Sequence, residues 1–463
     1  MGGEETIALF QRLGLLYPCE LESHILVPYV HLFPMDIQIP KSEDVNNDLN
    51  ELVFVTDCHP VILGQTNVGK KEDGAVMYIG PDSLSLVQHL PLSSNIKMNS
   101  TGESNEIDTY SILDFCAGSG VQAIAVLAAV KIAHPNAKAT FVDINSRALK
   151  FCLFNAILNE FDPSNLRVIK GDLLKGDVDS DCIGGEYGYN LRKQLQDEKA
   201  SYLKNDLLTV LTSNIFKKDN KDTCSLKSFS GYDLILSNPP FIPVPLLQEK
   251  DVGMRKIDQE ENQVSFDNIS KRYGLFSSGG SSGEEVLKSI ICLSGRLLKR
   301  YNSQHGQGLL AIVSEFMDPP MNANDSSSVL IKKVEKWWNG VDINNESILP
   351  KISGTTYPDI IEAKGTLYTN EYPVSSSLYA ERRSNNQSEY KLWLDHLDRL
   401  KIRSVSPGLL FVSVGNDMIP QNKLIKISHV QVPKTEQGSV WTPSNYNSVR
   451  FVQSHWSSFN KSN

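Results

Sequence analysis

The sequence predicts an α/β fold in which helices cover both faces of a mostly parallel sheet. From residue 112 onward, short apolar segments alternate with longer segments whose apolar residues recur at helical spacing. A turn of small residues, Ala117-Gly-Ser-Gly120, joins the first apolar segment to the first helix. Polar residues stand at the ends of four predicted strands, where ligands bind in sheets of this kind. They are Asp114, Asp143, Asp172 and Asn238.

Residues 1–92 are expected to form an N-terminal region that precedes the alternating core. Asp82 and Ser83 are of the types that cap helices, so they are expected to begin a helix that runs to about Leu90. The segment 91–109 is rich in Ser and Asn and is interpreted as a linker. The other elements expected here are a helix over 6–16 and strands over 52–56 and 75–79.

A core of about residues 108–316 carries the alternation. Its expected strands cover 112–115, 139–142, 166–170, 234–237 and 309–314, and its expected helices cover 121–133, 146–158 and 284–299. The segment 176–230 interrupts the pattern and is rich in Lys, Asp, Ser and Gly. Because connections inside compact βα units are short, this segment is interpreted as an insertion.

The C-terminal part, residues 317–463, is expected to complete the sheet and to end in a polar tail. Amphipathic patterns predict helices over 332–338 and 390–400, and a strongly apolar run predicts a strand over 409–414. The segment 317–330 and the chain from 432 onward are polar and are expected to be loops.

Composition and charge are those of an ordinary globular protein. Hydrophobic residues make up 40% and charged residues 21% of the chain, and the net charge of −9 argues against a large non-specific nucleic-acid surface. The seven cysteines and nine histidines show no metal-binding spacing, so no metal site is expected. No apolar run approaches the roughly 20 residues that cross a bilayer, and the N-terminus lacks a signal-peptide pattern. A cytoplasmic location is therefore predicted, with the nucleus as the alternative.

The glycine turn is typical of a site for a nucleotide-like cofactor. Glycine lets the backbone approach a ligand, and the free N–H groups of the following helix point at it. Gly118-Ser-Gly-Val-Gln-Ala123 fits the dinucleotide pattern G-x-G-x-x-A, and Asp143 stands 23 residues after Gly120, where that pattern places a ribose-binding acid. Taken alone, these residues indicate an NAD-dependent oxidoreductase.

The stretch Tyr232-Asp-Leu-Ile-Leu-Ser-Asn-Pro-Pro-Phe241 favours another class. Asn-Pro-Pro-Phe after an apolar strand resembles the catalytic motif of class I S-adenosylmethionine (SAM) methyltransferases that methylate planar amide or amino nitrogens. Asp114 and the glycines resemble the first motif of that family, D-x-x-x-G-x-G. Ser237-Asn-Pro-Pro-Phe-Ile-Pro243 is similar to the HemK-related enzymes, or "methyltransferase small" domains, that methylate glutamine in release factors and usually carry Tyr in place of Phe241.

The resemblance covers about residues 108–316 and implies a SAM-dependent enzyme. Its fold would be a Rossmann-like, seven-stranded methyltransferase sheet with an N-terminal extension and a long insertion. By position, the resemblance places several residues around SAM. Asp114, Gly118 and Gly120 would lie near the methionine part, Asp143 at the ribose hydroxyls and Asp172 near the adenine amino group. The other expected cofactor-binding residues are Ala117, Ile144, Leu173 and Asn238.

Methylation of a planar nitrogen requires hydrogen-bond acceptors, because the lone pair of a conjugated nitrogen is delocalised. Asn238 can accept through its side-chain carbonyl, and Pro239 can accept through its main-chain carbonyl. The Pro239-Pro240 backbone would hold both acceptors rigidly around an NH2 group. Phe241 would stack on the planar target. These four residues are the candidate catalytic residues.

Two other motifs are weaker. Gly64-Gln-Thr-Asn-Val-Gly-Lys70 resembles a phosphate-binding loop, but Lys71 replaces the Ser or Thr that would bind Mg²⁺ and no helix pattern follows. Gly279-Gly-Ser-Ser-Gly283 fits the nucleophile pattern G-x-S-x-G of serine hydrolases, but no convincing strand precedes it. Neither motif is expected to carry chemistry.

The methyl acceptor remains open between two classes. A protein glutamine side chain, as in a translation release factor, is the first hypothesis because of the Asn-Pro-Pro-Phe-Ile-Pro match and the acidic chain. The alternative is an exocyclic amino group of adenine or guanine in RNA or DNA, which requires a basic surface beside Asn238. Lys271-Arg272 and Lys299-Arg300 are the candidates for that surface. An NAD-dependent oxidoreductase is the distant alternative.

Overall fold

The structure is a computed structural model of the 463-residue chain. It describes residues 16–18, 26–28, 30–37, 50–57, 76–92, 109–184, 206–212, 231–245, 269, 273, 277–300, 308–321, 328–349, 358–414, 424–433 and 446–461. The expected helix over 6–16 lies outside these residues except for Leu16, and so does most of the expected linker. The phosphate-loop-like motif at 64–70 also lies outside them.

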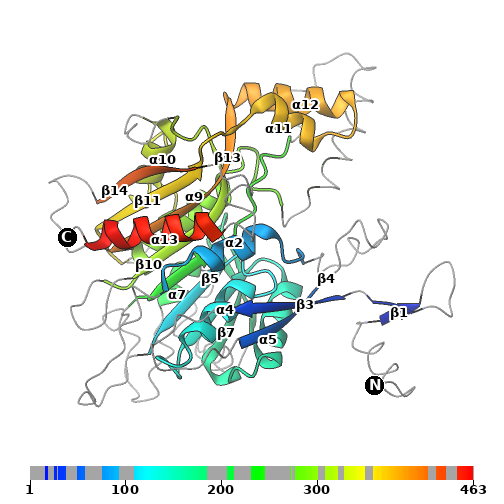
Figure 1. Ribbon diagram of the computed structural model, residues 1–463, viewed down its shortest axis with the longest axis vertical. Helices are drawn as coiled ribbons and strands as arrows, with labels where there is room; N and C mark the ends of the chain where they lie inside the picture. Colours follow the sequence, from blue (N-terminus) through cyan, green and yellow to red (C-terminus); the bar gives the residue numbers. More distant parts are fainter. Residues whose placement is uncertain are drawn as a thin grey trace.

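Helices and strands alternate along most of the described chain (Figure 1). In the N-terminal region they are β1 (Leu16–Pro18), β2 (Leu26–Pro28), β3 (Val30–Ile37), β4 (Asn50–Asp57) and α2 (Pro81–His89). The core contains β5 (Ser111–Phe115), α4 (Val121–Val130), β6 (Lys138–Asp143), α5 (Ser146–Leu158), η2 (Pro163–Asn165), β7 (Leu166–Asp172), β8 (Asp177–Gly184), α7 (Leu207–Thr212), β9 (Leu234–Ser237), α9 (Glu285–Leu297) and β10 (Leu309–Met317). The C-terminal part contains α10 (Val329–Trp338), β11 (Ala363–Asn370), β12 (Val374–Ser375), α11 (Ser376–Arg383), α12 (Gln387–Arg399), β13 (Ser404–Val414), β14 (Ile425–Val432) and α13 (Tyr446–Lys461).

The predicted α/β sheet is confirmed. Its middle consists of parallel strands in the order β7-β6-β5-β9-β10, which is the order 3-2-1-4-5 of open nucleotide-binding sheets. Strand β13 then runs antiparallel between β10 and β11. The sheet is wider than the seven strands expected, because β8, β12 and β14 bring it to ten. Strand order reverses between β5 and β9, so a ligand crevice is expected at the carboxyl ends of these two strands.

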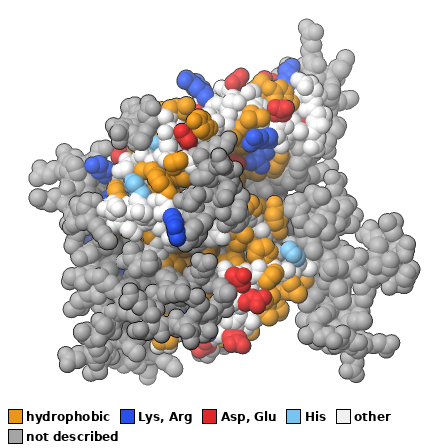
Figure 2. Space-filling model, viewed as in Figure 1, with side chains coloured by type: hydrophobic (Ala, Val, Ile, Leu, Met, Phe, Trp, Pro, Cys, Tyr) orange, Lys and Arg blue, Asp and Glu red, His pale blue; other side chains and the backbone are white. Residues whose placement is uncertain are grey.

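The surface on the side seen in Figure 1 shows no continuous charged area over the described residues. In the same view, Lys, Arg, Asp and Glu side chains lie in small groups separated by hydrophobic and neutral atoms (Figure 2). Among the described helices, none is long and apolar enough to cross a membrane.

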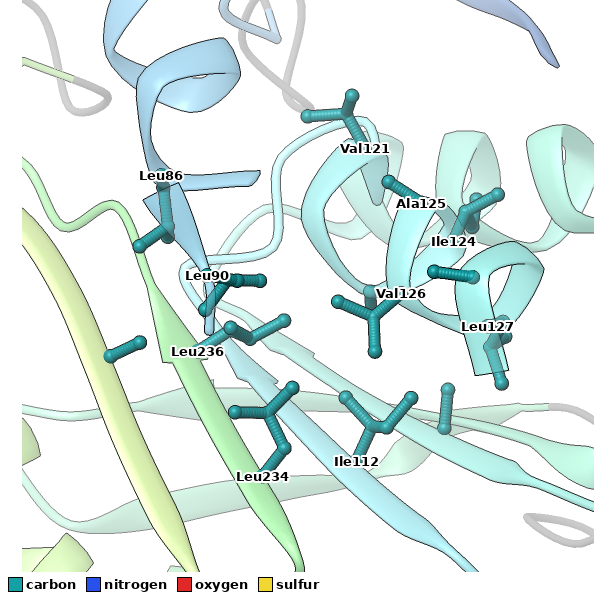
Figure 3. Close-up of a cluster of buried hydrophobic side chains, with 14 of the residues drawn as sticks. Leu86, Leu90, Ile112, Val121, Ile124, Ala125, Val126, Leu127, Leu234 and Leu236 are labelled. Carbon is teal, nitrogen blue, oxygen red and sulfur yellow. The ribbon is translucent and has the colours of Figure 1, made fainter. Parts of the chain in front are cut away.

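Both faces of the sheet are covered by apolar residues, because side chains of successive strand residues point in opposite directions. Helices α2, α4, α5 and α13 cover one face, and α7, α9 and α10 cover the other. Figure 3 shows part of the first face, where Leu86 of α2 and Leu90, just after this helix, meet Leu234 and Leu236 of β9. All ten residues of α4 are buried, because the β3–β4 hairpin packs on its outer side. This burial explains why the segment after the glycine turn is apolar all round.

Two asparagines of α5 bind the edge of the β3–β4 hairpin. Asn155 accepts from Val55 N at 2.7 Å and donates to Val55 O at 2.9 Å, and Asn159 pairs in the same way with Val53 at 2.9 and 2.8 Å. The two residues lie one helical turn apart, so their amides replace a neighbouring strand. Asn155 also donates to Ser119 O at 2.8 Å, which ties this edge to the glycine turn.

Three expectations about secondary structure were wrong. Residues 76–80 have no regular structure, although their apolar pattern predicted a strand. The segment 176–230 contributes β8 and α7, and the leucines of α7 are buried under the sheet, so this stretch is not purely an insertion. The tail contains α13, whose Val452 and Trp456 are buried against α2 and the sheet, whereas a loop was expected. The domain boundaries themselves stay a prediction.

Candidate active site

The glycine turn lies at the carboxyl end of β5, as predicted. Gly118 and Gly120 have φ values of 55° and 80°, which favour glycine. A Cβ on Gly120 would lie 3.2 Å from the Cα of Cys152, so this glycine also lets α5 approach. A Cβ on Gly118 would meet no atom within 4 Å. The turn therefore has open space at Gly118, where a ligand can reach its backbone.

Asp143, at the end of β6, holds this turn in place. Its two carboxylate oxygens accept from Gly118 N at 2.9 Å and from Asn145 N at 2.8 Å. Burial raises the pKa of Asp143, and these N–H groups oppose the rise. Ile144 follows and is 40% exposed beside the turn. Each carboxylate oxygen can accept a second hydrogen bond, so the predicted role of Asp143 at a ribose remains available.

Asp114 is fully buried below the turn. One carboxylate oxygen accepts from Ala123 N at 3.3 Å, and the other, Oδ1, has no hydrogen-bond partner. Burial raises the pKa of Asp114 well above its usual value. A buried carboxylate oxygen without a partner is costly in a protein interior. A ligand that donates a hydrogen bond to this oxygen would therefore be stabilised here, and a cationic donor would be stabilised most.

Asp172 and Leu173 lie one strand further from the switch point, at the end of β7. Asp172 Oδ1 accepts from Leu174 N at 2.9 Å and from Lys175 N at 3.2 Å, and its other oxygen lies 3.2 Å from the Lys175 ammonium. Leu173 is half-buried. Asp172 thus shapes the turn after β7, and the adenine-binding role of both residues stays a prediction.

Asn238 follows β9, and its side-chain amide has a defined orientation. Its nitrogen donates to Asp82 Oδ2 at 2.8 Å and to Ser83 Oγ at 3.0 Å. Its oxygen is buried and has no hydrogen-bond partner. Parallel pairing places Phe115 opposite Ser237, so Asn238 continues from the strand beside the glycine turn. The predicted acceptor atom is therefore present and free.

Sequence reasoning missed the part that α2 has in this site. Asp82 and Ser83 were expected to cap the helix, but the N-cap is Gly80 and neither side chain caps it. A Cβ on Gly80 would collide with Asp82 Oδ1, so any larger residue here would move the Asp82 carboxylate from its place. Pro81 at the first helical position was the available signal that the helix begins earlier.

The backbone after Asn238 rests on the glycine-rich loop 277–283. A Cβ on Gly279 would lie 2.7 Å from Pro240 O, and one on Gly283 would lie 2.5 Å from Phe241 O. Gly279 N also donates to Ile242 O at 3.0 Å. The Gly-Gly-Ser-Ser-Gly sequence is therefore explained by close backbone packing against the Asn-Pro-Pro-Phe segment, and not by a hydrolase nucleophile.

Helices α11 and α12 lie together in a lobe (Figure 1), and their apolar residues pack against the segment that follows Asn238. Phe241 is half-buried against an apolar cluster that this lobe shares with Ile242. Glu315 of β10 links the lobe to the sheet, because it accepts from Tyr379 OH at 2.7 Å and pairs with Arg383 at 2.9 Å. Burial raises the pKa of Glu315, Arg383 opposes the rise, and Asp82 adds to it. The stacking role of Phe241 stays a prediction.

One predicted basic surface lies at the wrong end of the sheet. Lys299 N donates to Tyr232 O, and its ammonium pairs with Asp233 at 3.0 Å, so it lies where β9 begins and not where Asn238 follows it. Lys299-Arg300 therefore does not flank Asn238. Lys271 and Arg272 lie outside the described residues. Within the described part of the chain, no group of His, Cys, Asp and Glu could hold a metal ion.

Known proteins resemble the fold only distantly. No protein-family model matches the sequence, and no curated protein matches it. The methyltransferase subunit of a type I restriction-modification system from Streptococcus thermophilus is 12% identical, with a TM-score of 0.34. The alignment covers 86% of this chain and 56% of that one, so the chain spans about half the length of that protein.

Two further solved structures are similarly distant. The ATP-dependent type ISP restriction-modification enzyme LlaBIII bound to DNA is 8% identical, with a TM-score of 0.36, and the alignment covers 82% of this chain and 21% of that one. A proposed class I SAM-dependent methyltransferase from Listeria monocytogenes is 13% identical, with a TM-score of 0.33, and the alignment covers 82% and 71% of the two chains. Similarity at this level does not establish an activity, so the site residues themselves carry the functional inference.

Proposed function

We propose that the protein is a SAM-dependent N-methyltransferase that acts on a planar amide or amino nitrogen. The buried, unpartnered side-chain oxygen of Asn238 carries this proposal, because its amide nitrogen is already engaged by Asp82 and Ser83. The only complement to that oxygen is a donor, such as the NH2 group of an amide or an aromatic amine.

The character of the unpartnered groups favours SAM over NAD. Asp114 Oδ1, Gln122 Oε1 and Asn238 Oδ1 are buried acceptors at the switch point that have no hydrogen-bond partner. SAM carries an ammonium group and a sulfonium, which these oxygens and the Asp114 carboxylate can stabilise. A dinucleotide would instead bring a pyrophosphate toward a buried carboxylate, which like-charge repulsion disfavours. The acidic ends of β5 and β6 thus fit a cationic cofactor.

The residues of this chain would act by positioning the acceptor. Bound SAM would supply an electrophilic methyl group, and transfer would form the N–CH3 bond as the methyl–sulfur bond breaks. Asn238 Oδ1 and the carbonyl of Pro239 would each accept one N–H of the target, which turns the nitrogen lone pair toward the methyl group. The nitrogen would then release one proton to solvent. Holding two reactants in this geometry supplies several kcal/mol of the barrier.

A protein glutamine is the acceptor that the described surface favours. Asp82 lies beside Asn238, and its negative charge would repel the polyanionic backbone of a nucleic acid. Lys299 lies at the opposite end of β9. A groove of about 520 Å³ opens at the carboxyl ends of β11 and β14, and its lining mixes apolar, aromatic and oppositely charged side chains, as a peptide requires. Its lining includes Met321, Glu371, Tyr372, Arg403 and Gln431.

Calorimetric titration with S-adenosylhomocysteine, with NAD as the comparison, tests the cofactor class. We expect S-adenosylhomocysteine to bind and NAD not to bind. Transfer from methyl-labelled SAM is then measured to a protein fraction and to an RNA fraction, with identification of the modified residue. N-methylglutamine is the expected product. If a methylated nucleobase is found instead, the acceptor is a nucleic acid and not glutamine. Binding of NAD alone would contradict the proposal of a methyltransferase.

Asn238→Ala tests the catalytic role directly. We expect methyl transfer to fall by about 10²–10³-fold, as when a hydrogen-bonding group that stabilises a transition state is removed. Binding of S-adenosylhomocysteine should change little. The matched control is Asn344→Ala, at an exposed position far from the site in the fold, which should keep the full rate. An unchanged rate in Asn238→Ala would show that this amide does not take part.

A further inference from the structure

We infer that Asp82 and Ser83 are positioning residues that fix which end of the Asn238 amide faces the methyl acceptor. This inference rests on the proposed function and adds helix α2 to the machinery of the reaction. The two ends of an amide have nearly the same shape, so only the surrounding hydrogen bonds decide its orientation. If the amide turned over, its NH2 group would face the acceptor, and it could not receive the N–H of a target.

Asp82 selects one orientation because an ionised carboxylate can only accept hydrogen bonds. Its Oδ2 lies 2.8 Å from the amide nitrogen of Asn238. In the reversed amide, two oxygens would lie at this distance without a hydrogen between them. The local charge therefore disfavours the orientation that is wrong for catalysis.

Ser83 provides a second hydrogen-bond acceptor for the amide nitrogen of Asn238. Its hydroxyl oxygen receives the Asn238 amide at 3.0 Å and the side-chain amide of Gln122 at 3.4 Å. Two donors occupy the two lone pairs of that oxygen, so it accepts from both. Gln122 belongs to the first turn of α4, directly after the glycine turn. The network thus connects the acceptor side of the site with the cofactor side.

Helix α2 is placed rigidly enough for this role. Leu86 and Leu90 pack on Leu234 and Leu236 of β9, the strand that ends just before Asn238 (Figure 3). At the same C-terminal end of the helix, His89 lies 3.2 Å from the hydroxyl of Ser448 on α13. Both partners of the hydrogen bond between Asp82 and Asn238 are therefore carried by packed elements.

The side-chain amide signals of Asn238 provide a test that needs no acceptor. We expect nuclear magnetic resonance of the ¹⁵N-labelled full chain to show slowly exchanging Asn238 NH2 protons, assigned by their loss in Asn238→Asp. In Asp82→Ala these protons should exchange at least about tenfold faster, and in Ser83→Ala by a smaller factor. Ser85→Ala is the matched control, because Ser85 is a buried serine of the same helix that contacts His89 instead. Signals that stay unchanged in both Asp82→Ala and Ser83→Ala would overturn the inference.

Methyl-transfer rates test the consequence. At saturating SAM and acceptor, Asp82→Ala should lower kcat about 10- to 100-fold, with binding of S-adenosylhomocysteine within threefold of the unsubstituted chain. Asp82→Asn should lower kcat by a smaller factor, because the new side-chain amide can still accept from Asn238 in one of its two orientations. Equal losses of kcat and cofactor binding, with unchanged Asn238 signals, would mean a merely structural role. If the unsubstituted chain methylates neither fraction, the proposed function fails, while the amide signals still decide the orientation.

Discussion

The two halves of the candidate site are assembled in different ways. The cofactor half consists of the ends of β5, β6 and β7, and its residues lie within one stretch from Asp114 to Leu173. The acceptor half collects groups from α2, the segment after β9, the loop 277–283, β10 and α11, which are far apart in the chain. The cofactor half depends on local backbone geometry, whereas the acceptor half depends on long-range tertiary contacts.

The two halves also differ in the kind of hydrogen bond that holds them together. In the cofactor half, carboxylates accept from backbone N–H groups at the glycine turn, as Asp143 does from Gly118. In the acceptor half, side chains bind side chains, as in the pair of Glu315 with Arg383. We therefore expect loss of the Glu315–Arg383 pair to affect the stability of the lobe formed by α11 and α12, and substitutions in the cofactor half to affect ligand binding.

The largest expected effect is that of Arg383→Met on the α11–α12 lobe. The guanidinium lies over the rings of Tyr273 and Tyr379 and pairs with Glu315, which is mostly buried. Removing one partner leaves a buried carboxylate unpaired, which costs about 3–4 kcal/mol. Hydrogen exchange of the backbone of α11 and α12 should accelerate accordingly.

The neighbouring Arg382→Met is the control for that substitution. Arg382 lies in the same turn of α11 but is exposed. Its replacement should change stability by less than about 0.5 kcal/mol. If the two variants behaved alike, the ion pair would not be what fastens the lobe to the sheet.

The contact of α2 with α13 should respond to pH through His89. Burial lowers the pKa of His89 to about 4, because the charged ring would lose its hydration, and the contact of the ring with Ser85 O at 2.7 Å opposes this shift only in part. His89 takes up a proton near pH 6.5 in the unfolded chain and only near pH 4 in the folded chain. Because the unfolded state therefore binds more protons between these values, the free energy of unfolding is highest above about pH 6.5 and decreases as the pH falls. Between pH 7 and 4 the loss should be about 3 kcal/mol.

Denaturant unfolding of the full chain and of His89→Gln at several pH values measures this contribution. The substituted chain should lose about 3 kcal/mol less than the unsubstituted chain over the same interval. His31→Gln, at an exposed position of β3, should follow the unsubstituted chain. Parallel pH profiles for the full chain and His89→Gln would show that His89 does not stabilise the contact of α2 with α13.

The cofactor half could be predicted from the sequence for a physical reason. Glycines at a strand end and acids after successive apolar strands are local signals, because parallel strands bring their carboxyl ends together. Asp114, Gly118 and Asp143 accordingly lie around one turn, as expected. The helix over 146–158 was predicted to the residue, since its apolar stripe is a local signal.

The acceptor half could be predicted only at Asn238. The contact of Asp82 with Asn238 spans 156 positions and leaves no periodic signal in the sequence, so cap propensity gave the wrong role. Helix α13 was expected to be a loop because most of its residues are polar. The helix buries only a narrow stripe, which includes Val452 and Trp456. The sequence motif therefore led to the prediction of Asn238, and the tertiary structure adds Asp82 and Ser83 as the side chains that bind its amide.

The smallest expected effect, and the one that most sharpens the comparison, is that of Asp114→Asn. Burial raises the pKa of Asp114 well above its usual value, so the folded chain is destabilised as the pH rises from the unfolded pKa to the folded one. An uncharged amide removes this cost, and the unliganded chain should become more stable at neutral pH. If Asp114 binds the ammonium group of S-adenosylhomocysteine as we propose, the same change should weaken that hydrogen bond by about 1.5–3 kcal/mol, a roughly 10- to 100-fold rise in Kd. Calorimetry should therefore show weaker binding while denaturant unfolding shows higher stability.

Asp179→Asn, at an exposed position of β8, is the control and should change neither the Kd nor the free energy of unfolding. Loss of stability together with affinity would make Asp114 a structural residue, whereas opposite signs would show that the fold gives up stability at this position to bind a cation.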